Sequence, residues 1–324
     1  MAVLEISGIT KSFTSHLSMG RTQVLRGVDL KVEAGEVLGL LGANGAGKTT
    51  TLKTAVGLLR PEQGSVRLFG MPITDVRARA RMGFLPENPY FYDYLSGREF
   101  LDFYARLCGI ARSGRAARVA EMLARVGLED RADRPLRKFS KGMVQRVGLA
   151  QALINEPDLI ILDEPMSGLD PIGRREFRDI ILELRRNGKA VLFSSHILAD
   201  AEALCDRVAI LRGGKVAACG RLDSMLSDRV RFWEATLSRV DPASLNVPHE
   251  KIWQRGEQVV VRLQEEEQVD TLIEEVRRLG GTLRSLVPHR RTLEDLFLGE
   301  LGSEAPEETK APAAEKPPIP KSRG

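Results

Sequence analysis

Apolar residues recur through the first quarter of the chain in short runs that turn residues separate. Four such runs lie between residues 3 and 70: VLEISGI, VLRGVDLKV, VLGLLG and SVRLFG. Their length and their flanking turn residues are typical of β-strands. A helical pattern, KTTTLKTAVGLL, interrupts them; it begins at Lys48 and stops before Pro61, because proline disfavours helix at the residue that precedes it. The sequence therefore predicts a strand, a glycine-rich loop and a helix in succession.

The pattern between residues 96 and 156 is helical. Its first segment begins with SGRE, in which Ser96 and Glu99 can satisfy each other's backbone amides as a capping box. Two more helices are expected, one at 115–126 and one that starts at FSKGM. One face of the first helix is expected to carry Phe100, Phe103 and Leu107.

Beyond this helical region, apolar strands alternate with helices. LIILDE, AVLFSSH and RVAIL have the pattern of buried strands, and a helix is expected near residues 173–186. Strands that alternate with helices indicate a largely parallel, buried sheet. We therefore predict an α/β unit over residues 1–225, with a β-rich subdomain and a helical subdomain at about 88–156.

A second, smaller unit is expected after residue 225. Residues 226–302 contain the strands VRFWEATL, VVVRL and TLRSLV around the amphipathic run VDTLIEEVRRL, which indicates a small α+β accessory domain. Residues 303–324 are rich in Pro, Glu, Lys and Ala and contain no aromatic residue. Because such a composition cannot bury enough apolar surface to fold by itself, we expect a disordered tail there.

Composition narrows the classes of function. A net charge of +4 over 324 residues gives no reason to expect a nucleic acid partner. Three cysteines without metal-ligand spacing fit a reducing, cytoplasmic compartment better than a disulfide framework. No stretch approaches the roughly 20 consecutive apolar residues of a membrane-spanning helix. A role at the membrane would therefore depend on a partner chain.

The stretch GANGAGKTT matches the phosphate-binding pattern GxxxxGK[ST], between a predicted strand and a predicted helix. In such a loop backbone amides wrap phosphates, Lys48 reaches the terminal phosphates and the Thr49 hydroxyl ligates Mg²⁺. The alternative is a plain glycine-rich turn. The residues expected to bind nucleotide here are Gly42, Ala43, Asn44, Gly45, Ala46, Gly47, Lys48, Thr49 and Thr50.

Two carboxylates end the apolar strand LIILDE, and the carboxyl ends of strands are where open α/β sheets bind ligands. We expect Asp163 to hold Mg²⁺ and Glu164 to polarise an attacking water. The alternative is a solvated turn before Pro165. His196 ends the next apolar strand, so it would meet Glu164 and a γ-phosphate at one rim, unless it is a structural histidine.

A second anion-binding helix start occurs at FSKGM, where Ser140 and Gly142 precede a helical run. SGLD follows the carboxylates and, taken alone, could be a plain turn. In this order, GANGAGKTT, FSKGMVQR, LIILDEP, SGLD and SSH resemble the ATP-binding cassette (ABC) ATPases, over roughly residues 1–225. The resemblance implies the P-loop NTPase fold of that family, with ATP and Mg²⁺ as cofactors.

The resemblance also explains the second phosphate-binding stretch. In the family, the segment that matches FSKGM binds the γ-phosphate of ATP seated on the P-loop of the other subunit. Ser140 and Gly142 would then complete a site on a second copy of this chain, or on a homologous ATPase subunit, and Asp170 of SGLD is also expected to bind nucleotide. The usual family pattern is LSGGQ, and this chain has Lys141 at its third position, either attracting nucleotide or lying in solvent. The other departures are Phe139 and Met143.

Two further positions follow from the resemblance. In MGFLPEN, Glu87 stands where the family usually has a glutamine that contacts Mg²⁺, and a carboxylate can also ligate this ion. Phe13 matches the aromatic residue that stacks on adenine, although a buried strand residue is the alternative.

Aromatic residues are concentrated in residues 84–104, which hold all four tyrosines. Within this stretch NPYFYDYLSG has the composition of a loop, where aromatic side chains indicate a protein interface. In the family this region receives a short helix of the membrane subunit. We therefore expect an integral-membrane permease to dock near Phe84–Tyr104, the alternative being a loop folded over its own core.

The resemblance implies an ATPase subunit at the cytoplasmic face of the membrane that drives transport, more often export, through a separate permease by ATP-dependent dimer closure. Its C-terminal unit and LPEN stretch are similar to those of subunits paired with ABC-2-type permeases. A soluble cassette ATPase of translation or DNA repair is the rival, but neither tandem cassettes nor a long coiled coil occurs in the sequence. A generic P-loop kinase or GTPase would leave FSKGMVQR, SGLD and SSH unexplained.

Overall fold

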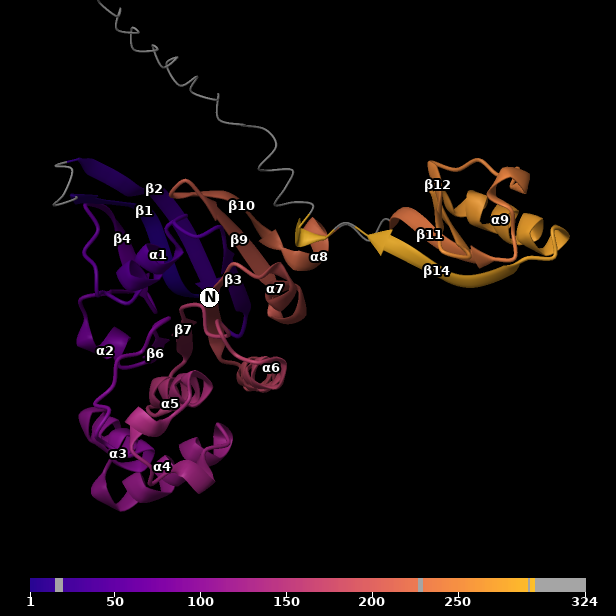
Figure 1. The fold of residues 1–324 in the computed structure, drawn as a ribbon. Helices are drawn as coiled ribbons and strands as arrows, with labels where there is room; N and C mark the ends of the chain where they lie inside the picture. The colour runs from indigo at the N-terminus through magenta and orange to yellow at the C-terminus, as the bar shows by residue number, and fades with distance from the viewer. Residues whose placement is uncertain (15–19, 227–229, 291, 295–324) are drawn as a thin grey trace, which may run out of the picture.

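The computed structural model describes residues 1–14, 20–226, 230–290 and 292–294. These residues form an α/β unit and a smaller α+β unit, whose elements appear in Figure 1. The tail expected at 303–324 lies outside the described residues.

A six-stranded sheet forms the centre of the first unit (Figure 1). Its order is β10-β9-β3-β8-β7-β6; the neighbours from β9 to β6 are parallel, and β10 runs antiparallel to β9. All residues of β3, β7 and β8 are buried, as strands covered on both faces should be. The predicted parallel, buried sheet is confirmed. Its strands are β3 (Val37–Leu41), β6 (Met82–Leu85), β7 (Leu159–Leu162), β8 (Ala190–Ser195), β9 (Arg207–Arg212) and β10 (Lys215–Arg221).

The register of this sheet brings three strand ends together. Leu41 of β3 pairs with Ser195 of β8, and Leu162 of β7 pairs with Phe193 of β8. Because parallel strands end at the same edge of a sheet, the segments that follow β3, β7 and β8 emerge side by side.

An antiparallel sheet of order β2-β1-β4-β5 packs with helix α1 on the central sheet. One hydrophobic cluster joins Leu4 of β1, Leu38 of β3 and Leu52 of α1. Helix α1 ends at Ala55, earlier than the apolar pattern predicts, because the chain turns at Gly57 with φ 80°. These elements are β1 (Ala2–Thr14), β2 (Arg21–Glu33), β4 (Gln63–Leu68), β5 (Met71–Pro72) and α1 (Lys48–Ala55).

The predicted helical region contains α3 (Gly97–Leu107), α4 (Arg112–Arg125) and α5 (Lys141–Leu153), with the predicted capping box at the start of α3. The predicted face of α3 is wrong in part: Phe100 is buried, but Phe103 is 37% exposed and Leu107 is 65% exposed. The buried side of α3 instead includes Gly97, Leu101 and Ala105. Gly97 packs against Ala132, Phe139 and Leu123, and the side of α3 that meets these residues is the covered one, so Phe103 and Leu107 lie toward solvent.

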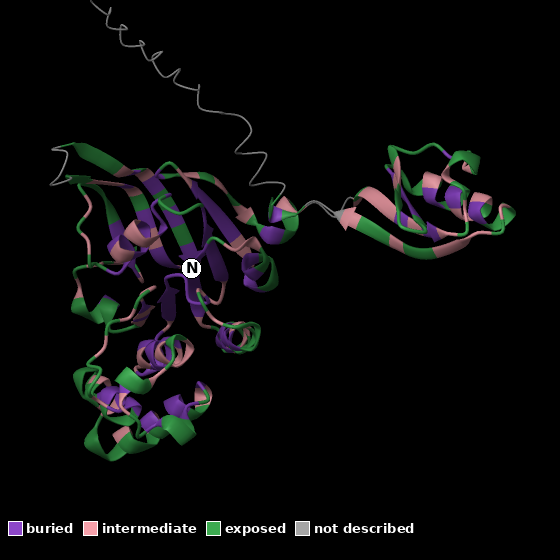
Figure 2. Ribbon diagram, viewed as in Figure 1, coloured by how far each residue is buried: buried purple, intermediate pink, exposed green. Residues whose placement is uncertain are grey.

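Buried residues are concentrated in the strands of the central sheet, and exposed residues in the helices around it (Figure 2). The remaining helices of the first unit are α2 (Val76–Arg79), α6 (Pro171–Arg186), α7 (Leu198–Leu204) and α8 (Leu222–Met225), with single 3₁₀ turns at Glu129–Arg131 and Leu136–Lys138. Across the described ranges, no helix combines the length and the apolarity needed to cross a membrane.

The smaller unit is a sheet of order β12-β13-β11-β14 with α9 on one face, in agreement with the predicted α+β fold. Val269, Leu272 and Val276 of α9 pack with Ala235 and Leu237 of β11. The elements are β11 (Val230–Ser238), a 3₁₀ turn at Pro242–Ser244, β12 (Lys251–Arg255), β13 (Gln258–Leu263), α9 (Glu266–Arg278) and β14 (Thr282–Arg290).

After β14 the chain returns to the first unit. Leu293 is fully buried and belongs to the same hydrophobic cluster as Leu204 of α7 and Leu222 of α8. Its backbone N–H donates to Glu202 Oε1 at 2.8 Å. The sequence pattern assigns Leu293 to the accessory unit, but the structure places it in the core of the first unit. Its contacts come from distant segments, which no local pattern reveals.

Leu293→Ala should destabilise the first unit by about 2–4 kcal/mol, since it removes a fully buried side chain. Both tryptophans, Trp233 and Trp253, lie in the accessory unit, so their fluorescence reports that unit alone. We expect the transition followed by circular dichroism to move to lower denaturant while the tryptophan transition stays in place. Val287→Ala, at a residue 46% exposed, is the matched control. Equal shifts in both probes would contradict this assignment of Leu293.

Candidate nucleotide-binding site

The loop between β3 and α1 presents backbone amides at the sheet edge. Gly47 precedes α1 with φ 108°, and no side chain caps the helix. This backbone conformation requires glycine, and a Cβ at this position would also lie 2.9 Å from Leu25 Cδ2 and push that side chain aside. The free amides at the start of α1 therefore face the space where an anion is favoured.

A cavity of about 510 Å³ opens in front of this loop. It brings together residues from the loop, the end of β6, the end of β7 and the end of β8, as the sequence predicts. Val24 and Ser167, which the sequence did not single out as ligands, also line it. The predicted residues that line the cavity are Ala43, Asn44, Gly45, Gly47, Lys48, Thr49, Thr50, Glu87, Glu164 and His196.

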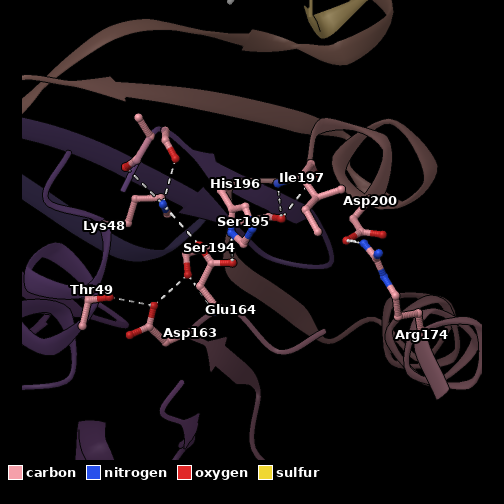
Figure 3. Close-up of polar contacts among 12 residues, drawn as sticks. Lys48, Thr49, Asp163, Glu164, Arg174, Ser194, Ser195, His196, Ile197 and Asp200 are labelled. Atoms are coloured by element: carbon pink, nitrogen blue, oxygen red, sulfur yellow. Dashed lines mark hydrogen bonds and ion pairs between the residues drawn. The ribbon is translucent and has the colours of Figure 1, made fainter. Parts of the chain in front are cut away.

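Lys48 is buried at the floor of the cavity (Figure 3). Its Nζ donates to the carbonyl oxygens of Gly42 at 2.8 Å and Ala43 at 3.3 Å, and lies 3.2 Å from Glu164 Oε1. Removing one partner of a buried ion pair leaves an uncompensated charge, which is costly. The Lys48 ammonium group could therefore give up the carboxylate only if another anion took its place.

Asp163 is fully buried beside Thr49 (Figure 3). Its Oδ1 accepts hydrogen bonds from Ser194 Oγ at 2.7 Å and from Thr49 Oγ1 at 3.2 Å. Its Oδ2 is buried and has no hydrogen-bond partner within the described ranges. Burial raises the pKa of the Asp163 carboxyl, and the hydrogen bonds from Ser194 and Thr49 offset part of that rise. A buried oxygen without a partner is a site at which a cation can bind.

Glu164 contacts both Lys48 and His196 (Figure 3). Its backbone adopts φ 47°, and its N–H donates to Ser194 Oγ at 2.8 Å. While Oε1 faces Lys48, Oε2 lies 2.8 Å from His196 Nδ1. The predicted meeting of Glu164 and His196 is therefore present, and contact of His196 with a phosphate stays a prediction. Ser194 was missed, because a serine inside an apolar strand has no distinguishing local pattern.

The second anion-binding stretch lines a different cavity, of about 460 Å³. Ser140 Oγ caps α5 by accepting from Met143 N, and Asp170 Oδ1 caps α6 by accepting from Gly173 N. Ser140, Gly142 and Asp170 share this cavity, and none of them lines the cavity at Lys48. One chain therefore does not bring its two phosphate-binding stretches together.

The side chain of Lys141 lies against the SGLD turn. A Cβ placed on Gly168 would be 2.6 Å from Lys141 Nζ, so the lysine packs directly over that glycine. Lys141 is exposed, but it is held at the turn instead of extending freely into solvent.

Phe13 lies on β1 and is 43% exposed, so the alternative of a buried strand residue is wrong. Its ring is 5.8 Å from Lys11 Nζ and does not line the cavity at Lys48. Stacking of Phe13 on adenine stays a prediction.

Comparison with known proteins agrees with this geometry. A family model described as ABC transporter matches residues 25–167. An uncharacterized ABC transporter ATP-binding protein of Nostoc sp. is 42% identical over 311 residues, which cover 93% of this chain and 90% of that protein. The chain belongs to the family of ABC transporter ATP-binding proteins. The matched stretch covers most of both chains and therefore extends beyond the first unit into the smaller one.

Two further ABC proteins are similar to this chain. The Nod factor export ATP-binding protein I of Burkholderia orbicola is 36% identical over a stretch that covers 70% of this chain and 75% of that protein. A dimeric ATP-binding cassette solved in a post-hydrolysis state with ADP and Pi has the same fold, with a TM-score of 0.63 and 24% identity over 68% of this chain and 98% of its own. The ABC ATPase family binds and hydrolyses ATP, which accounts for the phosphate-binding loop and the carboxylates.

Lys48→Ala should weaken nucleotide binding by about 10–100-fold, because it removes a charge-assisted donor to phosphate. Titration with a fluorescent ADP analogue measures this. Lys189→Ala, which removes a surface pair with Asp158, is the control and should bind like the wild type. Unchanged affinity in Lys48→Ala would contradict the placement of phosphate in this cavity.

Proposed function

We propose that the protein is the ATP-hydrolysing subunit of an ABC exporter, peripheral on the cytoplasmic face of the membrane, whose permease is a separate chain. The observation that carries this proposal is the cluster at one sheet edge: Lys48 on the phosphate-binding loop, Asp163 with an unpartnered oxygen, and Glu164 between Lys48 and His196. This cluster contains the donors and acceptors that phosphoryl transfer to water requires.

Mg²⁺ fits the residues beside Thr49. Asp163 Oδ2 is buried without a hydrogen-bond partner, and Glu87 lines the same cavity as the Thr49 hydroxyl. Among the described residues, no three His, Cys, Asp or Glu side chains gather as a metal site. Nucleotide oxygens would therefore have to complete the coordination, as is usual for this ion. When bound, Mg²⁺ supplies neutralisation of charge on the phosphates.

For hydrolysis, Glu164 has to act on a water at the γ-phosphate. Its Oε1 is paired with Lys48. Phosphate oxygens compete for the same ammonium group, so nucleotide binding would release Oε1 to accept a proton from the attacking water. His196 holds Oε2 and so keeps the carboxylate directed into the cavity.

We further propose that two ATPase subunits close around ATP. Within one chain, Ser140 and Gly142 line a cavity separate from the P-loop, so their phosphate-binding role requires another chain. The N-terminus of α5 and the Ser140 hydroxyl would donate to the γ-phosphate bound on the partner's P-loop. The dimeric cassette with ADP and Pi that shares this fold supports the proposal.

A groove of about 660 Å³ supports docking of a permease. It is lined by Phe84, Tyr90 and Leu107 among others, and Tyr90 is 99% exposed. Tyr92 and Tyr94 of the same loop do not line the groove, but they are 51% and 66% exposed. Of the loop aromatics, Phe91 packs on the core, with its ring 4.4 Å from Phe100. Exposed aromatic residues around an apolar groove are typical of protein interfaces. Export, in place of import, is supported by the similarity to the Nod factor export protein.

Glu164→Gln should lower the ATPase rate by about 10²–10⁴-fold while ATP binding persists, because the amide cannot accept the proton of the attacking water. Size-exclusion chromatography with saturating ATP and Mg²⁺ should then show a stable dimer. Glu183→Gln, which alters a surface pair with Arg125, serves as the control. A monomeric Glu164→Gln protein under these conditions would exclude closure around ATP.

Changing Tyr92 and Tyr94 together to alanine should leave the soluble ATPase rate within about twofold of the wild type, since both side chains are largely exposed. Co-purification with the permease, and stimulation of the ATPase by it, should fall sharply. Val287→Ala should change neither. An equal loss of soluble activity in the double variant would argue against a docking role.

A further inference from the structure

Ser194 connects the two carboxylates of the site through one hydroxyl (Figure 3). Its Oγ donates to Asp163 Oδ1 at 2.7 Å and accepts from the Glu164 backbone N–H at 2.8 Å. The residue is fully buried. No other side chain in the described part of the chain is hydrogen-bonded to both Asp163 and Glu164.

The strand register explains this position. Phe193 of β8 pairs with Leu162 at the end of β7, so the next residue of β8 lies beside the first residues after β7. At that point Glu164 turns away from the sheet with φ 47°, a conformation that residues other than glycine rarely adopt. Its N–H therefore leaves the strand ladder, and the Ser194 hydroxyl accepts it.

We propose that Ser194 is a positioning residue for ATP hydrolysis. By holding Oδ1, it fixes the orientation of Asp163, whose Oδ2 has no hydrogen-bond partner in the described ranges and would be available to a cation. By holding the Glu164 N–H, it fixes the strained backbone from which the carboxylate reaches His196. The inference rests on the proposed function, in which Asp163 ligates Mg²⁺ and Glu164 acts on water.

The bond from Ser194 is better suited to this task than the bond from Thr49. Thr49 Oγ1 is more distant from Asp163 Oδ1, at 3.2 Å, and its own oxygen is an expected ligand of Mg²⁺. With Thr49 engaged as a metal ligand, Ser194 would be the donor that keeps the Asp163 carboxylate in place. Residues that orient a metal ligand in this way typically contribute about 10–100-fold to metal affinity or activity.

The neighbouring serine has a different task. Ser195 Oγ bonds to the backbone N–H and carbonyl of Ile197, across His196, and is hydrogen-bonded to neither carboxylate. The two serines at the end of β8 therefore bond to different groups: Ser194 to Asp163 and Glu164, and Ser195 to Ile197. Only Ser194 is expected to link metal binding to the geometry of Glu164.

The test uses Ser194→Ala, which removes the hydroxyl, and Ser194→Cys, which keeps most of the volume but bonds weakly. Each full-length variant is assayed for kcat, for KM, and for the affinity of a fluorescent ADP analogue in EDTA and in Mg²⁺. We expect kcat to fall about 10–100-fold. We also expect Mg²⁺ to lose most of its strengthening effect on ADP binding, while the affinity in EDTA stays within about twofold of the wild type, because the phosphate-binding loop is untouched. Ser96→Ala, which removes a buried hydroxyl that caps α3, controls for a general loss of stability and should retain kcat.

Two results would overturn the proposal. One is an unchanged kcat and an unchanged Mg²⁺ effect in both variants. The other is an equal loss of ADP affinity with and without Mg²⁺, which would show that the hydroxyl only holds the fold. If the wild type itself failed to hydrolyse ATP, the proposed function would fail instead, and the two failures are thereby distinguishable.

Discussion

Parallel pairing of β3, β7 and β8 is the constraint on which the site depends. These three strands are separated by long stretches of sequence, yet their register makes them end at one edge of the sheet. The phosphate-binding loop, the two carboxylates and the histidine are each the first residues beyond a strand. Their spacing is therefore set by main-chain hydrogen bonds among three fully buried strands, which are among the least deformable supports a protein offers.

The polar cluster at that edge illustrates how local burial directs chemistry. Lys48 and Glu164 are both buried and face each other at 3.2 Å. Such pairs add little net stability, because the cost of removing two charges from water offsets their attraction. Under the proposed function, phosphate oxygens would take the place of the Glu164 carboxylate at Lys48. Asp163 is only partly hydrogen-bonded: its Oδ1 accepts two hydrogen bonds, and its Oδ2 has no partner within the described ranges.

The sequence predicts much of this arrangement, because motifs and strand ends are local features. The loop before Lys48, the carboxylates after LIILDE and the cap at Ser140 occur where the pattern places them. Features that depend on tertiary packing are harder to predict from the sequence. The exposure of Phe103 depends on how α3 packs against its neighbours, and the position of Ser194 beside Asp163 follows from the pairing of β7 with β8. Neither has a signature along one segment.

The return of the chain to bury Leu293 changes how the accessory unit should be regarded. The chain enters the accessory unit after α8 and leaves it before Leu293, and Leu222 of α8 and Leu293 belong to the same hydrophobic cluster of the ATPase unit. In topology, the accessory unit is therefore an insertion into the ATPase unit. The entropy of closing such an excursion rises only slowly with its length. Units of very different size can therefore be accommodated between the same two anchors, and the catalytic core needs no rebuilding when one is exchanged for another.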